Sequence, residues 1–261
     1  RVASRGLGDV YKRQIIFVKK SKARLNTKNK ILAVIVAKKK STRLFNKNLK
    51  LFCGKPLIYW GILAAKKSKK IQDVMISSDS KKILSLSKRF HKKIIIRKRP
   101  KKLSSNSISS LEVIKDAINF LKKSGRNYSH VALIQVTSPL RNHKHIDEAI
   151  KIMNKKNLSG IVGITKTECP KIWTTYIKPK SMKDFMTENK YLKKLYNNKK
   201  SNISYKINGA IYVISLNKLY AKNPFYSDKI GTYLMSRKHS IDIDTPFDFQ
   251  IGELLKKNIK L

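Results

Sequence analysis

Short apolar runs rich in β-branched residues alternate along this chain with segments whose apolar residues recur every three or four positions. The first run, residues 31–37, contains only Ile, Leu, Val and Ala, a pattern typical of a buried strand. Residues 109–123 instead carry apolar side chains at helical spacing, which predicts a helix with one buried face. The same criteria predict strands at 31–37, 73–77, 93–96, 131–136, 160–164, 210–214 and 240–243, and helices at 56–68, 80–90, 109–123, 145–154 and 246–257.

This alternation predicts an α/β fold built on a doubly wound, mostly parallel sheet. Such sheets bind ligands in the crevice at the carboxyl ends of their strands. Residues 165–207 are polar, rich in Lys and Asn, and are expected to form a protruding arm. Residues 1–30 differ from the rest, and the first 14 resemble read-through of a sequencing adaptor. We therefore treat 1–30 as a leader and 31–261 as the domain.

Three Asp residues lie together in a chain that has few acidic residues. Only 15 Asp and Glu occur among 261 residues, yet Asp242, Asp244 and Asp248 share one seven-residue window. In a strand, Asp242 and Asp244 would lie on one face, where both reach a single Mg²⁺. Asp248 has a structural explanation, since Thr245 as N-cap and Pro246 as first helical residue complete an approximate capping box with it.

Two loops at predicted strand ends are further candidates. Residues 37–48 are rich in cations that suit a triphosphate, although composition alone favours a solvated basic loop. Gln135 interrupts an apolar run, and a buried amide without partners is costly, so it either faces the crevice or has dedicated hydrogen bonds. Thr137, Ser138 and Arg141 follow it, where ligands bind; a Ser-Pro turn explains this segment equally well.

Composition excludes some classes of protein. The formal net charge of +45 favours polyanions, but the excess comes from 49 Lys against 11 Arg, whereas base reading favours Arg. Lys, Asn and Ile share A/T-rich codons, so we expect genome composition to explain the charge and no nucleic acid partner. The seven-residue run at 31–37 is far shorter than the roughly 20 residues of a membrane span. Cys53 and Cys169 form no CxxC pair, which favours a reduced, cytoplasmic setting.

Seven motifs occur in an order that identifies a family resemblance. They lie at 41–48, 54–58, 76–80, 99–103, 133–141, 208–212 and 240–246, and include Asn46-Lys47-Asn48, Gln135-Val-Thr-Ser-Pro-Leu-Arg141, Asn208-Gly-Ala-Ile-Tyr212 and Ser240-Ile-Asp-Ile-Asp-Thr-Pro246. Together they span about 31–255 and resemble the CMP-N-acetylneuraminate synthetase (acylneuraminate cytidylyltransferase) family.

The resemblance implies a Rossmann-like nucleotide-diphospho-sugar transferase fold and a homodimer whose arm, around 165–205, reaches the neighbouring site. It implies attack by the anomeric hydroxyl of an acidic nine-carbon sugar on the α-phosphorus of CTP, with Mg²⁺ as cofactor and pyrophosphate released. The implied roles are nucleotide binding by Lys38, Ser41, Arg43, Lys47, Asn48, Arg99, Ser109 and Ser110, sugar binding by Gln135, Thr137, Ser138 and Arg141, metal binding by Asp242 and Asp244, and catalysis by Lys47 with these two aspartates.

Four positions depart from the family pattern. Lys38 stands where Arg is common and lacks its bidentate fork, Thr42 replaces a phosphate-contacting Lys, Asn106 replaces an Asp, and Lys206 replaces an Arg. Three alternatives therefore stay open. The first is a CMP-Kdo synthetase-like activity, which residues 41–44 also resemble, and the second is an inactive nucleotide-binding relative. The third, from another class, is a basic nucleic-acid-binding protein.

Overall fold

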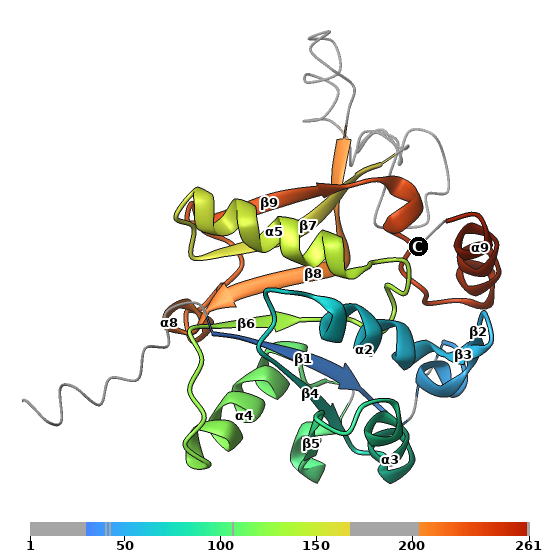
Figure 1. Ribbon diagram of the computed structural model, residues 1–261, viewed down its shortest axis with the longest axis horizontal. Helices are drawn as coiled ribbons and strands as arrows, with labels where there is room; N and C mark the ends of the chain where they lie inside the picture. The colour runs from blue at the N-terminus through green and yellow to red at the C-terminus, as the bar shows by residue number, and fades with distance from the viewer. Residues whose placement is uncertain (1–29, 40, 42, 106, 168–203, 260–261) are drawn as a thin grey trace, which may run out of the picture.

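The computed structural model describes residues 30–39, 41, 43–105, 107–167 and 204–259. Seven strands in this part of the chain form one sheet in the order β5-β4-β1-β6-β8-β7-β9 (Figure 1). All neighbours pair in parallel except β8, which is antiparallel to β6 and β7; the predicted mostly parallel α/β sheet is confirmed. The strands are β1 (Ile31–Ala37), β4 (Asp73–Ser78), β5 (Ile95–Lys98), β6 (His130–Leu133), β7 (Gly160–Thr167), β8 (Ser204–Ser215) and β9 (Ile230–Met235).

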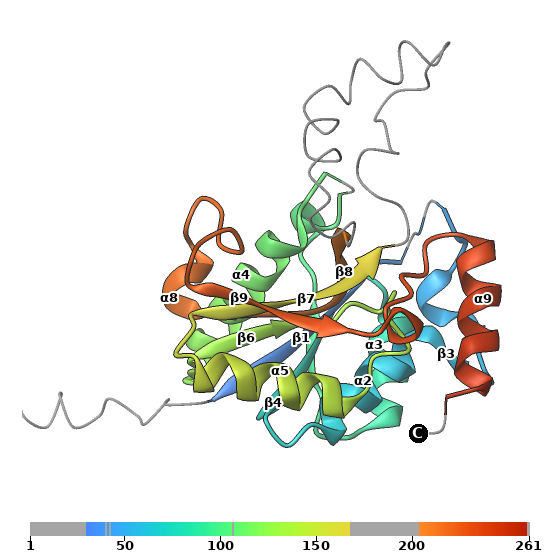
Figure 2. The same cartoon turned by 90° about the horizontal axis from the view of Figure 1, so that it is seen from above.

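Helices cover both faces of the sheet (Figure 2). One face carries α2 (Leu57–Lys67), α3 (Lys81–Phe90) and α5 (His143–Lys155), and the other carries α4 (Ser110–Lys123) and the short α8 (Leu216–Leu219). Alternate residues of β1 divide between the two layers: Ala33 and Ile35 belong to the core under α2, α3 and α5, whereas Leu32 and Val34 pack with residues of α4. Because both faces of β1 are buried, its sequence is apolar throughout.

The last helix lies beside the carboxyl ends of the central strands. Helix α9 (Pro246–Lys257) packs on the small hairpin of β2 (Leu51–Phe52) and β3 (Lys55–Pro56), where the Phe52 and Phe249 rings meet edge to face at 5.4 Å. Gly252 allows this approach, since a Cβ there would lie 3.0 Å from the Phe52 ring. The packing brings the end of the chain next to the segment that follows β1.

The predicted elements differ from the structure at the carboxyl edge of the sheet. Strand β6 ends three residues earlier than predicted: the Ile134 amide still bonds to the Val34 carbonyl, and a turn follows at 136–137. Residues 240–243, predicted as a strand, form a loop; β9, which the sequence pattern did not reveal, already occupies the sheet edge beside β7. Strand β5 begins two residues later than expected.

The predicted leader and arm fall largely outside the described residues. Of 1–30 the structure describes only Lys30, and of 165–207 it describes the ends that belong to β7 and β8. None of the helices in the described part of the chain is both long and apolar enough to cross a membrane.

The N-terminus of α9 generates a prediction about stability. The Thr245 hydroxyl accepts the Asp248 amide at 3.2 Å, and the Asp248 carboxylate accepts the Thr245 amide at 2.7 Å, so the predicted capping box is present. Thr245→Ala should lower the free energy of unfolding by about 1 kcal/mol. Denaturant titration measures this, with Thr245→Ser as the control that keeps the hydroxyl. An unchanged midpoint in the Ala variant would show that the box contributes nothing.

Candidate active site at the carboxyl edge of the sheet

A cavity of about 350 Å³ lies at the carboxyl ends of β1 and β6. It gathers side chains from the segment after β1, the start of α4 and the segment after β6. The lining residues are Val36, Lys38, Ser41, Arg43, Lys47, Asn48, Ser110, Leu133, Gln135, Val136 and Thr137. Eight of them are residues predicted to bind nucleotide or sugar, so the structure brings together segments that the sequence only suggested were related.

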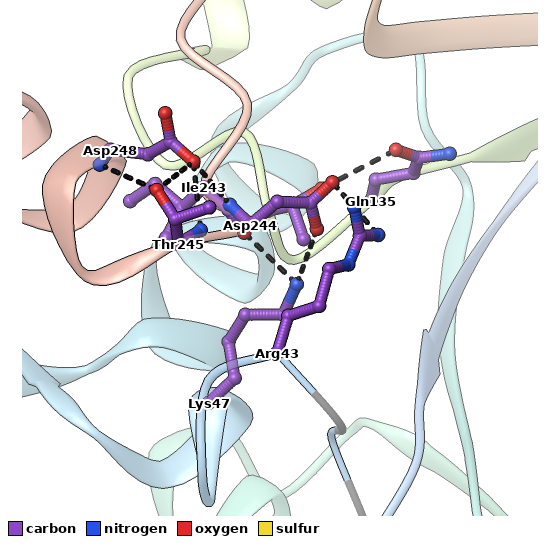
Figure 3. Close-up of polar contacts among 8 residues, drawn as sticks. Arg43, Lys47, Gln135, Ile243, Asp244, Thr245 and Asp248 are labelled. Atoms are coloured by element: carbon purple, nitrogen blue, oxygen red, sulfur yellow. Dashed lines mark hydrogen bonds and ion pairs between the residues drawn. The ribbon is translucent and has the colours of Figure 1, made fainter. Parts of the chain in front are cut away.

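Residues from opposite ends of the domain meet beside this cavity (Figure 3). The Lys47 ammonium lies 2.9 Å from the Asp244 Oδ1 atom and donates to the Ile243 carbonyl at 2.9 Å. The Arg43 guanidinium lies 3.0 Å from Asp244 Oδ2. The Lys47 side chain is 13% exposed and that of Arg43 is 67% exposed, so water screens the Arg43 pair much more strongly. The shielded Lys47 contact therefore dominates the junction.

The turn that carries Lys47 is held by Asn46 and Asn48. Asn46 adopts the left-handed conformation with φ of 50°, which Asn tolerates better than most residues. The Asn48 side-chain amide, buried next to it, donates to the Lys38 carbonyl at 2.7 Å. Asn48, predicted to bind nucleotide, therefore also ties the turn to the end of β1, and its side-chain nitrogen is already engaged.

Lys38 lines the cavity, whereas Arg99, also predicted to bind nucleotide, is not among its lining residues. The Lys38 ammonium donates to the Ser105 carbonyl at 2.8 Å, and burial followed by the nearby charge of Arg99 lowers its pKa. Arg99 is buried and donates to the Ser77 carbonyl at 2.7 Å, while its Nη1 atom has no partner among the described residues. Buried donors usually have an acceptor, so this nitrogen is a site that the described residues leave unsatisfied.

The two serines at the start of α4 have different surroundings. Ser109 is the N-cap, and its hydroxyl accepts the Glu112 amide at 3.3 Å. Ser110 instead lines the cavity. The amino terminus of a 14-residue helix favours anions through its free amides and its dipole, so this wall suits a phosphate.

The segment after β6 faces a glycine of β8. The Ile243 amide donates to the Thr137 carbonyl at 2.8 Å and so ties the loop that carries the aspartates to this segment. Gly209 has φ of +72°, and a Cβ there would lie 2.9 Å from Gln135 Oε1 and 3.6 Å from Asp242 Oδ2. Only glycine allows this approach at a left-handed position. Gln135, Asp242 and Gly209 therefore form one compact group.

A bulge in β8 produces this arrangement. Val162 and Ile164 of β7 are two residues apart, whereas their partners on β8, Tyr212 and Ile207, are five apart. Asn208 fills the bulge: its side chain accepts the Ala210 amide at 3.1 Å and donates to the Ser240 hydroxyl at 3.0 Å. Asn-Gly pairs are typical of hairpin turns, but this pair lies inside strand β8. A glycine within an apolar run was the sequence signal for a bulge.

Two sugar-binding candidates are buried in the structure. Ser138 is completely buried, and its hydroxyl has no hydrogen-bond partner in the described part of the chain. Arg141 was expected at the ligand site but lies in the interior, only 2% exposed, and donates to the backbone carbonyls of Gln135 and Ala210. Arg141 thus lies beneath the site and does not line its cavity.

Asp242 and Asp244 were expected on one face of a strand, but they share a loop and differ in surroundings. Asp244 is paired with cations, whereas burial is the main cause that raises the pKa of Asp242, opposed by a hydrogen bond from Thr137. No group of three or more His, Cys, Asp or Glu suited to a metal occurs within the described ranges. Two carboxylates suit Mg²⁺, which takes its remaining ligands from substrate phosphates and water. The donor chemistry fits such an ion, which would replace at least one of the cations that contact the two Asp244 oxygens.

A larger cavity, of about 480 Å³, lies between the end of the β7–β8 ribbon and α9. Its cations include Lys166, Lys206 and Lys238, which are all exposed. It contains none of the predicted site residues. Exposed lysines are common in this chain, so volume alone does not make this cavity the better candidate.

A cationic cavity with adjacent carboxylates, at the carboxyl edge of a mostly parallel α/β sheet, defines the class of nucleotide-binding α/β proteins. The family model described as "Cytidylyltransferase" matches residues 32–259. The chain belongs to the cytidylyltransferase family, as the motif order indicated.

Relatives and solved structures agree with this assignment. The chain is 30% identical to a CMP-N,N'-diacetyllegionaminic acid synthase of Legionella pneumophila, over 87% of this chain and 96% of the relative. It is 29% identical to an N-acylneuraminate cytidylyltransferase of Escherichia coli, over 88% of this chain but only 54% of the relative, so it spans about half of that protein. It is 27% identical to a pseudaminic acid cytidylyltransferase of Campylobacter jejuni, over 87% of this chain and 97% of the relative.

The fold is also similar to that of a CMP:2-keto-3-deoxy-manno-octonic acid synthetase solved with CTP. The TM-score is 0.63 at 15% identity, and the similarity covers 88% of this chain and 99% of that one. At this identity the similarity concerns the fold alone.

The contrast between the two aspartates generates a prediction. Because the pKa of Asp242 is raised in the folded protein, the folded state binds its proton more tightly, and stability falls as pH rises through the ordinary Asp value. Because Asp242 is exposed, water reduces this effect, so Asp242→Asn should raise the melting temperature slightly at pH 7, and the gain should vanish near pH 3. Asp244→Asn should instead lower the free energy of unfolding, by on the order of 1–3 kcal/mol, because Lys47 loses its carboxylate. Thermal unfolding of both variants across pH measures these changes. A stability change in the same direction for both variants at pH 7 would contradict the expected contrast.

Proposed function

We propose that this protein transfers CMP from CTP to the anomeric hydroxyl of an acidic nine-carbon sugar of the sialic-acid kind, releasing pyrophosphate. One observation carries the proposal: the Lys47–Asp244 contact joins the cationic turn after β1 to the aspartate loop at the edge of a single cavity. Relatives named for N-acylneuraminate, diacetyllegionaminic acid and pseudaminic acid support the choice of sugar class.

The cations of the cavity suit a triphosphate. Lys38, Arg43 and Lys47 come from the segment after β1, and Ser110 stands at the amino terminus of α4. Concentrated positive charge and free amides neutralise phosphate oxygens. As pyrophosphate leaves, Lys47 is the shielded cation that stabilises the charge developing on it.

The residues that would hold Mg²⁺ are Asp242 and Asp244. When bound there, the ion would neutralise charge on the phosphate oxygens as a Lewis acid. The chain's own contribution is positioning: Gln135 and Gly209 meet beside Asp242, where the sugar would approach. The bond that forms joins the anomeric oxygen to the α-phosphorus, and the bond that breaks releases pyrophosphate with its electron pair. The hydroxyl proton passes to water.

We further propose a homodimer in the cytoplasm, with the arm of 165–207 completing the neighbouring site. Its central residues, 168–203, lie outside the described part of the chain. A CMP-Kdo synthetase-like activity is the second candidate, favoured by the resemblance of residues 41–44 to the loop of that family.

A substrate panel tests the proposal. Purified protein with CTP and Mg²⁺ should release pyrophosphate in the presence of N-acetylneuraminate, legionaminic acid derivatives or pseudaminic acid, and release less with Kdo. Selectivity for Kdo would support the second candidate. Salt-sensitive RNA or DNA binding, with no pyrophosphate released from any sugar, would favour the nucleic-acid alternative.

The aspartate pair gives a sharper prediction. Asp242→Asn combined with Asp244→Asn should reduce Mg²⁺-dependent turnover by at least about a thousandfold, because the donors proposed for the ion are lost. Circular dichroism should show an intact fold. Asp116→Asn is the control, since Asp116 pairs with Arg97 away from the cavity and its loss should leave turnover within about twofold. Full activity in the double variant would refute the metal assignment.

A further inference from the structure

Arg141 is a buried cation with no carboxylate partner in the part of the chain that the structure describes. Its side chain lies between the segment after β6 and strand β8, and a Cβ on Gly61 of α2 would contact its Nη2 atom at 3.7 Å. Nε donates to the Ala210 carbonyl at 3.1 Å and Nη2 to the Gln135 carbonyl at 3.0 Å. Nη1 has no partner among the described residues.

A buried guanidinium without a carboxylate partner lowers the free energy of unfolding. Burial lowers the pKa of Arg141 to about 10, so the guanidinium still carries its charge at neutral pH. Transferring an unpaired cation from water to a protein interior is unfavourable, and apolar residues of similar volume often replace buried ions without loss of stability. Core packing alone therefore does not explain an arginine at this position.

The two acceptors explain the choice of residue. One is the carbonyl of Gln135, whose side chain lines the cavity. The other is the carbonyl of Ala210. This residue follows Gly209, and the Gln135 side chain packs against Gly209. A planar guanidinium directs two donors at fixed angles, whereas the ammonium of a lysine cannot hold both carbonyls in that geometry. Arg141 thus fixes the separation between the two backbones that define this corner of the site.

We propose that Arg141 is a positioning residue that sets the Gln135 side chain against Gly209, and so places the amide for the sugar substrate. The inference rests on the proposed function for the identity of that substrate. It assigns Arg141 an indirect role through Gln135, with no contact to sugar or nucleotide.

A double-mutant cycle tests the proposal. Arg141→Lys keeps the charge but loses the fork, and should lower kcat/KM for the sugar by about tenfold or more, with the KM for CTP changed less than about twofold. Gln135→Ala removes the group through which Arg141 acts. Since the two changes affect one interaction, the double variant should be no slower than Gln135→Ala alone. Multiplicative effects would overturn the proposal.

The matched control is Arg97→Lys. Arg97 is also a partly buried arginine in the sheet, but its two donors bind Asp116, away from the cavity lining. It should lose comparable stability without a change in kcat/KM. If Arg141→Lys behaves like this control, or fails to fold, Arg141 serves the fold and the positioning role is wrong.

A ligand-free readout separates this inference from the proposed function. The side-chain amide signals of Gln135 in a ¹⁵N-correlated NMR spectrum can be assigned by their loss in Gln135→Ala. Arg141→Lys should shift or broaden them, and Arg97→Lys should not. Unchanged signals would overturn the positioning role even in an active enzyme. Altered signals in a protein that transfers CMP to no sugar would support the positioning role of Arg141 and refute the proposed transferase function.

Discussion

The Lys47–Asp244 ion pair is the interaction on which the site depends. It joins residues 197 positions apart, and its lysine is largely shielded from water. The turn after β1 and the loop before α9 are not paired as strands. Their relative position depends on this ion pair, on the hydrogen bond from Lys47 to the Ile243 carbonyl, and on the packing of Phe249 against Phe52. Packing sets the distance between the two segments, and charge sets which atoms face each other.

The scarcity of acidic residues makes such a pair unusual in this chain. With 60 basic and 15 acidic residues, most cations cannot find a carboxylate. Several lie over aromatic rings instead, including Lys256 at 4.1 Å from the Trp60 ring centre and Lys50 at 5.3 Å from that of Phe249. Ring faces attract cations weakly at exposed sites. The few carboxylates are therefore shared among many cations, and Asp244, which contacts both Lys47 and Arg43, is the clearest case.

Much of the fold was predictable because it depends on local pattern. The strand at 31–37 and the capping box at Thr245 were both visible in the sequence and are present in the structure. The geometry of the site was less accessible. Residues 240–243 alternate as a strand does, yet β9 holds the sheet edge, and Arg141 follows a strand end as ligand residues do, yet points inward. Both outcomes depend on which segments are neighbours in space, and periodicity along the chain carries no such information.

Two ionisable groups near Gln135 differ in exposure, since Arg141 is buried and Asp242 is exposed. Burial lowers the pKa of Arg141, and apolar residues of similar volume often replace such buried ions without loss of stability. The pKa of Asp242 is raised, but this residue is exposed, so water screens its charge. They do not neutralise each other: Arg141 donates to carbonyls beneath the corner formed by Gln135 and Gly209, while Asp242 lies on its open side. Stability alone therefore does not explain the buried Arg141. Arg141 thus bonds to the backbone beneath this corner, and Asp242 remains accessible above it; rigid support under an accessible polar group is the arrangement that a binding site requires.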